Sequence, residues 1–131
     1  MNKIVEILKR CGPFSLATSD GKRAHVRPFN TIEEIAGEIY LCTANTKDVF
    51  QQMMGQPEVE ICCMISEDTW VRLTGRAVRV DDVSVRQAIL DEEPDLKENY
   101  AADDGVLEAV RLEDVVCMKY CYPHEPERIE A

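Results

Sequence analysis

Two adjoining stretches decide the fold of this 131-residue chain: residues 14–29 read FSLATSDGKRAHVRPF, and residues 38–47 read EIYLCTANTK. Larger and smaller residues alternate from Phe14 to Thr18, as in a half-buried strand. The Asp-Gly pair that follows favours a turn, because Asp can bond its own backbone and Gly accepts a positive φ. Residues 23–29 return as a second strand, so the first stretch predicts a β-hairpin.

Pro28 interrupts the returning strand of this hairpin. Proline cannot donate to a strand ladder, so we expect it on a sheet edge or at a bulge, with Arg27 beside an irregular backbone. Residues 39–43 predict a third strand. Residues 44–47 end it and begin a helix.

The rest of the chain is rich in short strands. Its patterns predict helices over residues 2–10, 46–54 and 81–93, and strands over residues 58–65, 69–80, 105–110 and 114–122. Gly75 predicts a bulge within its strand. Residues 30–37 are interpreted as a hairpin connection and residues 123–131 as a loosely ordered tail. We therefore expect a mainly β fold: one small antiparallel, Greek-key-like barrel spanning residues 1–131, with two or three helices covering its openings.

The predicted helix 46–54 carries a hint of a binding site. Thr46 is a candidate cap, which places Lys47 in the first turn, where its charge opposes the helix dipole. A bound anion would reverse this penalty, because the backbone N–H groups and the lysine would converge on it. The alternative is an ordinary solvent-exposed lysine.

Composition excludes several functions. The net charge of −10 argues against nucleic-acid binding, which needs a basic surface. No apolar run approaches the ~18 residues of a membrane span, and the N-terminus lacks a signal-peptide pattern, so we expect a cytoplasmic location. The six cysteines are then expected to be reduced, mostly as small buried side chains. Their spacing, and the presence of only two histidines in the sequence, argue against a metal site.

Against this acidic background, two sets of cations stand out: Lys22, Arg23, His25 and Arg27 in the hairpin, and Arg72, Arg76 and Arg79 in the later strand. They favour an anionic ligand. The alternative is that they pair with the abundant carboxylates, because structural ion pairs resemble functional ones.

Several motifs together carry a family resemblance. LATSDG at 16–21, VRPF at 26–29, IYLCTANTK at 39–47 and WVRLTG at 70–75, followed by an acidic segment with Pro94 and Tyr100, resemble the FMN-binding split-barrel family related to pyridoxamine 5′-phosphate oxidase. The similarity spans roughly residues 4–122. It implies FMN held at the interface of a homodimer.

The resemblance also assigns candidate roles. Basic residues matching Arg27 and Lys47 hold the phosphate in relatives, the backbone around Phe29 meets the edge of the flavin ring, and the strand of Trp70 and Arg72 reaches the partner's flavin. In the oxidase, a glutamine stands near the position of Trp70. The implied cofactor-binding residues are Arg27, Pro28, Phe29, Thr43, Thr46, Lys47, Trp70 and Arg72.

The cofactor implied by the resemblance suggests the type of reaction. The resemblance implies an FMN-dependent oxidoreductase of unknown small-molecule substrate, with NADH or NADPH as a candidate electron donor and no catalytic residue identified. The oxidase carries a C-terminal Arg-x-His motif for its substrate, which the printed sequence lacks, so poor activity on pyridoxamine phosphate is expected. The alternative is a non-catalytic binding protein for flavin, haem or another planar ligand. Haem would need an axial ligand such as His25 or His124, and a deazaflavin would use the same basic phosphate site.

Overall fold

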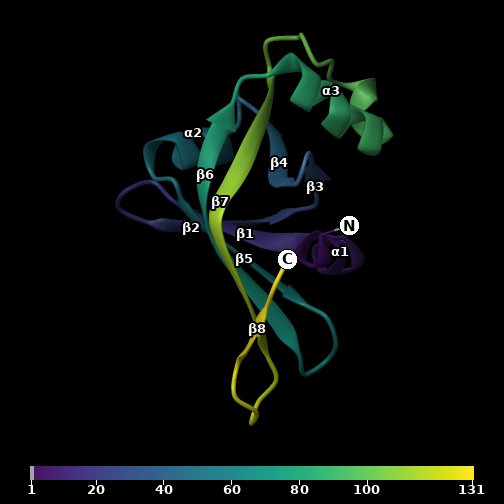
Figure 1. Cartoon of the computed structure of the whole chain (residues 1–131). Helices are drawn as coiled ribbons and strands as arrows, with labels where there is room; N and C mark the ends of the chain where they lie inside the picture. The colour runs from purple at the N-terminus through teal and green to yellow at the C-terminus, as the bar shows by residue number, and fades with distance from the viewer. Residues whose placement is uncertain (1) are drawn as a thin grey trace.

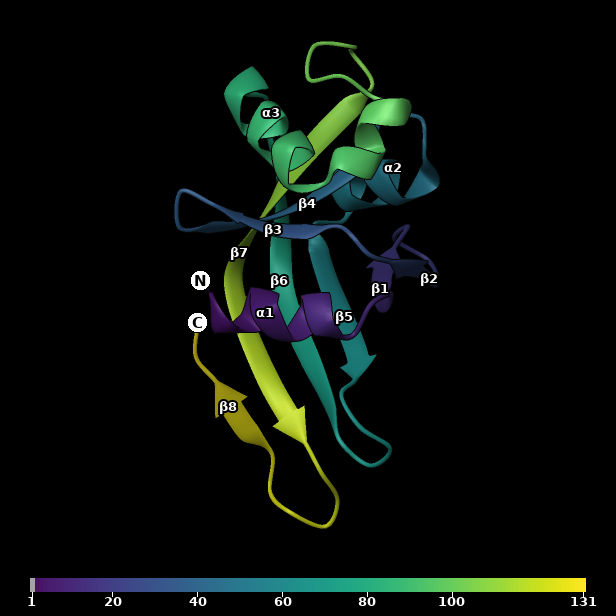
Figure 2. The same ribbon diagram turned by 90° about the vertical axis from the view of Figure 1, so that its right-hand side faces the viewer.

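The computed structural model describes residues 2–131. Its strands form one antiparallel sheet in the order β2-β1-β5-β6-β7-β4-β3, with β8 added to β7 (Figures 1 and 2). The path starts at β2 and ends at β3, and these two strands do not pair within residues 2–131. The sheet is therefore a barrel that remains split, as the sequence predicts.

The elements have the following bounds. The strands are β1 Phe14–Ser19, β2 Ala24–Phe29, β3 Ile32–Ile35, β4 Glu38–Ala44, β5 Glu58–Met64, β6 Trp70–Val80, β7 Leu107–Tyr120 and β8 Glu127–Ile129. The helices are α1 Lys3–Arg10, α2 Asp48–Gly55, α3 Val83–Glu92 and the 3₁₀ helix η1 Pro94–Glu98. Two views at right angles place α3 and η1 at one end of the molecule, while α1 crosses its side (Figures 1 and 2).

The predicted hairpin is confirmed. Strands β1 and β2 pair from Phe14↔Phe29 to Ser19↔Ala24, and the turn closes on Asp20, whose Oδ1 accepts from the backbone N–H groups of Lys22 and Arg23. Pro28 lies on β2, the edge strand of the sheet, where its missing N–H breaks no ladder. The pairing is regular, so the predicted backbone irregularity at Arg27 is not found.

The expectation for residues 30–37 is wrong. Residues 32–35 form strand β3, which pairs with β4 through a turn that holds Ala36 and Gly37 at positive φ. The two glutamates in β3 hide the strand pattern. Both have partners at the start of the chain: Lys9 Nζ of α1 binds Glu33, and the backbone N–H of Asn2, the N-cap residue of α1, donates to Glu34.

The C-terminal expectations are also wrong. The two strands predicted at 105–110 and 114–122 are one strand, β7, because Asp114 at φ 54° bends the chain without ending its pairing. The bulge predicted within the strand of Gly75 lies instead on β7. Thr74 pairs with Val116 and Arg76 with Glu113, so Asp114 and Val115 both stand opposite Gly75, where an added Cβ would lie 3.4 Å from the Glu113 carbonyl oxygen. The supposed loose tail includes β8, which pairs with β7.

Two apolar clusters form the interior. The larger one fills the barrel beneath α1 and α2 and includes Leu8, Leu16 and Leu73. The smaller one lies under α3 and η1 and includes Tyr40, Ile89 and Leu107. Helix α1 begins as predicted, because the Asn2 side chain accepts from the N–H groups of its first turn.

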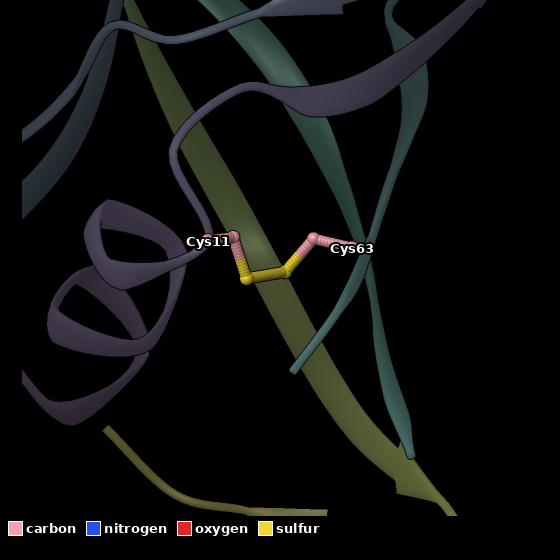
Figure 3. The surroundings of a disulfide bond; sticks show 2 residues. All are labelled: Cys11 and Cys63. Carbon is pink, nitrogen blue, oxygen red and sulfur yellow. A yellow bond between two sulfur atoms is a disulfide. The ribbon is translucent and has the colours of Figure 1, made fainter. Parts of the chain in front are cut away.

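The expectation that all cysteines are reduced is wrong for two of them. A disulfide joins Cys11, which ends α1, to Cys63 on β5 (Figure 3). Folding brings their Cα atoms to 6.3 Å, a separation that a disulfide can span. Sequence spacing could not reveal this pair, because 52 positions separate them. The free cysteines are Cys42, Cys62, Cys117 and Cys121, of which Cys42 and Cys117 are buried as expected.

Across residues 2–131, no helix is long and apolar enough to cross a membrane.

Candidate functional site

The edge strand β2, the end of β4, the start of α2 and the η1 segment meet around a cavity of about 180 Å³, which we call the β4–α2 pocket. Its lining residues are Pro28, Phe29, Asn30, Thr31, Cys42, Thr43, Ala44, Lys47, Leu96, Tyr100 and Leu107. Four residues of the predicted cofactor site are therefore brought together: Pro28, Phe29, Thr43 and Lys47.

Thr43 lines this pocket and carries an unusual polar atom. Its side chain is only 6% exposed, and its Oγ1 has no hydrogen-bond partner in the described part of the chain. A buried hydroxyl without a partner costs stability, on the order of 1–3 kcal/mol. A polar ligand group in the pocket would remove this cost.

The start of α2 forms the polar end of the pocket. The N-cap residue is Lys47 itself, and no side chain caps the helix. The prediction that Thr46 is the cap, with Lys47 in the first turn, is therefore wrong; Thr46 is exposed and does not line the pocket. The first-turn N–H groups of an uncapped helix lack intrahelical acceptors, so they remain open to an anion. Asp48 in the first turn opposes this attraction.

Arg27 does not line the pocket. Its guanidinium turns toward α2, where Nη2 donates to Gln52 Oε1 at 2.7 Å and Nη1 donates to Thr18 Oγ1 at 2.7 Å and to the Leu16 carbonyl oxygen at 3.2 Å. Burial lowers the pKa of Arg27, and the nearby Asp48 partly offsets this. The sequence did not reveal Thr18 and Gln52 as partners of this arginine, because they lie on other elements.

Trp70 and Arg72 lie elsewhere, on a surface that we call the outer sheet face. Three cross-strand rows of β5, β6 and β7 form it: Met64, Trp70 and Tyr120; Cys62, Arg72 and Met118; Glu60, Thr74 and Val116. The Trp70 and Tyr120 rings stack with their centroids 5.5 Å apart. Met64 is 53% exposed and Val116 is 37% exposed, so the face presents apolar surface to its surroundings.

The second set of cations pairs with carboxylates, as the alternative interpretation predicts. Arg72 binds Glu60 at 2.6 Å, Arg76 binds Glu113 at 2.7 Å and Arg79 binds Glu108 at 2.8 Å. In the hairpin, His25 is 2.8 Å from Asp20, and this contact and the turn N–H groups lower the pKa of Asp20 to about 2. Lys47 therefore remains the cation that lines the pocket.

The η1 segment and Cys42 add walls that sequence reasoning missed. Leu96 and Tyr100 reach the pocket from η1 and the loop after it. Burial raises the pKa of the Cys42 thiol to about 12, with Glu93 adding to the effect, so Cys42 is a neutral wall residue and not a nucleophile. In the sequence, the only local sign of this wall is Tyr100, which lies in an otherwise acidic segment.

Neither a metal site nor a histidine is found at the pocket among the described residues. Among residues 2–131, no group of three or more His, Cys, Asp or Glu side chains could hold a metal ion. Neither His25 nor His124 lines the pocket.

Comparisons with known proteins agree with this architecture. Residues 1–114 match the family model described as pyridoxamine 5′-phosphate oxidase. A crystal structure of a NimC/NimA family protein from Clostridium acetobutylicum is 35% identical, with a TM-score of 0.91 over 98% of this chain and 90% of that chain. A comparison with curated proteins finds no match.

More distant structures share the fold alone. A protein related to general stress protein 26, of the pyridoxinephosphate oxidase family, from the same organism is 8% identical, with a TM-score of 0.74 over 95% of this chain and 89% of that chain. HutZ, the heme storage protein from Vibrio cholerae, is 14% identical, with a TM-score of 0.66 over 85% of this chain and 87% of that chain.

Proposed function

The chain belongs to the pyridoxamine 5′-phosphate oxidase family, and from that premise we propose that it binds FMN in the β4–α2 pocket and acts as a flavin-dependent oxidoreductase on a small molecule. The observation that carries the proposal is the buried Thr43 hydroxyl, which has no partner within residues 2–131 and belongs to a residue that lines the same pocket as Lys47.

A phosphate fits the polar end of this pocket. It accepts hydrogen bonds, so it can satisfy the Thr43 hydroxyl, the Lys47 ammonium and the open N–H groups of α2 together. Asp48 weakens the site, which leaves Lys47 as the main source of attraction. Arg27 contributes indirectly, because its bonds to Thr18 and Gln52 hold β2 against α2.

The remaining walls suit a flat apolar ring. Pro28, Phe29, Leu96, Tyr100 and Leu107 supply apolar surface to the pocket wall. Flavin supplies the hydride and electron chemistry, while the protein orients the ring and its substrate. A protein base is not required for such a reductase.

The pocket of one chain is small for this ligand. Its volume of about 180 Å³ lies below the roughly 300–1,000 Å³ of ordinary ligand sites. A second copy of the chain would supply the missing wall, and we assign the outer sheet face to that contact. Trp and Arg are enriched at interfaces, and two-fold pairing makes both sites equivalent. Trp70 and Arg72 would then reach the partner's flavin.

The competing function is a non-catalytic holder of flavin, haem or another planar ligand. The haem storage protein among the structural neighbours raises this alternative through the fold alone. Haem binding would need an axial ligand other than His25 and His124, which lie outside the pocket.

The test begins with titration of the purified protein by FMN, haem and a deazaflavin, followed by flavin fluorescence or absorbance and thermal unfolding. We expect saturable FMN binding, bleaching of the bound flavin by NADH or NADPH without oxygen, and recovery on adding a quinone or nitro compound. Binding of haem or deazaflavin in place of FMN overturns the cofactor. Binding of FMN with no turnover by any donor and acceptor supports the non-catalytic function.

A further inference from the structure

A disulfide and a cavity lie together outside the proposed flavin site. The bond joins Cys11, the C-cap residue of α1, to Cys63 on β5 (Figure 3). The cavity has a volume of about 360 Å³, within the roughly 300–1,000 Å³ of ordinary ligand sites. Its lining residues are Ile7, Arg10, Cys11, Met64 and Ile65. A small molecule in this cavity would therefore lie beside one end of the disulfide.

The two half-cystines differ in their access to solvent. Cys63 is 6% exposed and belongs to the larger apolar cluster, whereas Cys11 is half-buried and lines the cavity. Met64 and Ile65, which also line it, are exposed, so solvent reaches the cavity walls. Thiol–disulfide exchange requires a thiolate to reach one of the two sulfur atoms. A thiolate from solvent would therefore attack Cys11 and displace Cys63.

The free cysteines of the chain do not supply this thiolate. Burial raises the pKa of the Cys42, Cys62 and Cys117 thiols, which keeps them neutral and weakly nucleophilic. Cys62 is next to Cys63 in sequence, but neighbouring side chains on a strand point to opposite faces. Cys121 does not line the cavity. The attacking thiolate therefore has to come from another molecule.

Arg10 gives the cavity a preference for negative charge. Of the two cations in the last turn of α1, Lys9 binds Glu33, whereas Arg10 forms no ion pair within residues 2–131. Arg10 directly precedes Cys11, is exposed and lines the cavity. A guanidinium can donate two parallel hydrogen bonds to one carboxylate. Arg10 therefore favours a thiol that carries a carboxylate, although the net charge of −10 makes the protein as a whole repel anions.

We propose that this cavity is a thiol–disulfide exchange site for small thiols that carry a carboxylate. The thiolate attacks Cys11 Sγ and forms a new S–S bond, while the Cys11–Cys63 bond breaks and its electron pair leaves on Cys63, which takes a proton from water. The product is a mixed disulfide on Cys11. A second thiolate attacks the sulfur of the bound small thiol and leaves with it as a small disulfide, and Cys11 takes up a proton. Two small thiols are oxidised as one protein disulfide is reduced.

Helix α1 has other attachments to the barrel besides the disulfide. Its Ile4, Val5 and Leu8 side chains are buried, and Lys9 binds Glu33 on β3. These contacts do not involve either sulfur atom, so we expect the mixed disulfide to form on a folded protein.

Brief exchange reactions on the full chain test the site. Accessible free thiols are first blocked by alkylation without reductant, and the protein is then mixed with 3-mercaptopropionate, which is anionic, or 2-mercaptoethanol, which is neutral. After quenching in acid, peptide mapping by mass spectrometry locates the adduct. We expect the adduct on Cys11 and a newly released thiol on Cys63. An adduct on Cys63, or no adduct on Cys11 with either thiol, would overturn the proposal.

A charge variant tests the role of Arg10. Arg10→Gln should slow the reaction with 3-mercaptopropionate at low salt by about two- to fivefold, as expected for an exposed ion pair, and leave the rate with 2-mercaptoethanol unchanged. Lys3→Gln removes the same charge from an exposed position at the other end of α1 and should behave as the wild type. If the two variants react alike with the anionic thiol, the carboxylate preference does not exist. Exchange that occurs only on unfolding would give this contrary result. The experiment uses no flavin, so it is independent of the proposed function.

Discussion

Arg27 and Gln52 are joined by a hydrogen bond of 2.7 Å from the guanidinium to Oε1, which ties the edge strand β2 to helix α2. The same oxygen accepts the Thr18 hydroxyl at 2.5 Å, so one amide holds both strands of the hairpin. Pro28 and Phe29 follow Arg27 directly, and Lys47 occupies the N-cap position of the helix that carries Gln52. This contact therefore fixes two walls of the pocket relative to each other.

Arg27→Ala should lower the free energy of unfolding by about 1–3 kcal/mol, because it leaves the Thr18 and Gln52 side chains short of a donor. Urea unfolding without flavin gives the measurement. Arg23→Ala, at an exposed turn position, is the matched control and should change little. Equal unfolding midpoints for the two variants would show that the hydrogen bonds of Arg27 do not stabilise the fold.

Lys47→Ala should weaken FMN binding by roughly tenfold to a hundredfold, because a charge-assisted bond contributes about 1.5–3 kcal/mol. Its effect on unfolding without ligand should be small, since the side chain is exposed. Flavin fluorescence titration measures the affinity. Lys22→Ala, an exposed lysine in the hairpin turn, removes the same charge from the protein. If FMN affinity falls equally in both variants, the effect comes from the net charge of the protein. The phosphate would then not bind at the start of α2.

Thr43→Val should have opposite effects on stability and binding. Replacing an unpartnered buried hydroxyl with a methyl group should raise the free energy of unfolding by about 1 kcal/mol without ligand, while FMN affinity falls because a phosphate donor is lost. Thermal unfolding with and without FMN separates the two effects. Thr46→Val, on the exposed neighbouring threonine, is the control. A variant that binds FMN as tightly as the wild type removes Thr43 from the site.

Val116→Glu should weaken the proposed homodimer, because it places a charge within the apolar rows of the outer sheet face. Sedimentation with and without FMN measures association, and FMN should strengthen it because the ligand contacts both subunits. Val83→Glu, at an exposed position on α3, is the matched control. A protein that binds one FMN per chain as a monomer would rule out the shared site, together with the roles of Trp70 and Arg72.

Thiol titration in denaturant without reductant should find the four free cysteines and not all six. Reduction of the Cys11–Cys63 bond should lower the free energy of unfolding by about 2–4 kcal/mol, since the bond closes a long loop. Cys121→Ser should leave this difference unchanged, because Cys121 is free. If reductant has no effect on unfolding, the disulfide does not stabilise the fold.

Local sequence determined much of the barrel. The alternation in residues 14–18 and the Asp20-Gly21 turn each depend on a few neighbouring residues, and each is confirmed. Thr43 and Lys47 lie four positions apart, across the end of a strand, so their meeting at one pocket also follows from local order.

Only the tertiary structure determined the strands and side-chain contacts that depend on residues distant in the sequence. Strand β3 carries two glutamates whose partners, Lys9 and Asn2, lie at the start of the chain, and β7 continues through Asp114 because it pairs with β6 on both sides of that residue. Arg27 follows the same rule: the resemblance implies a phosphate contact, and in the fold its Nη1 and Nη2 atoms donate to Thr18 on β1 and Gln52 on α2. A sequence shows which groups a residue can bond, but packing alone determines which of them come within reach.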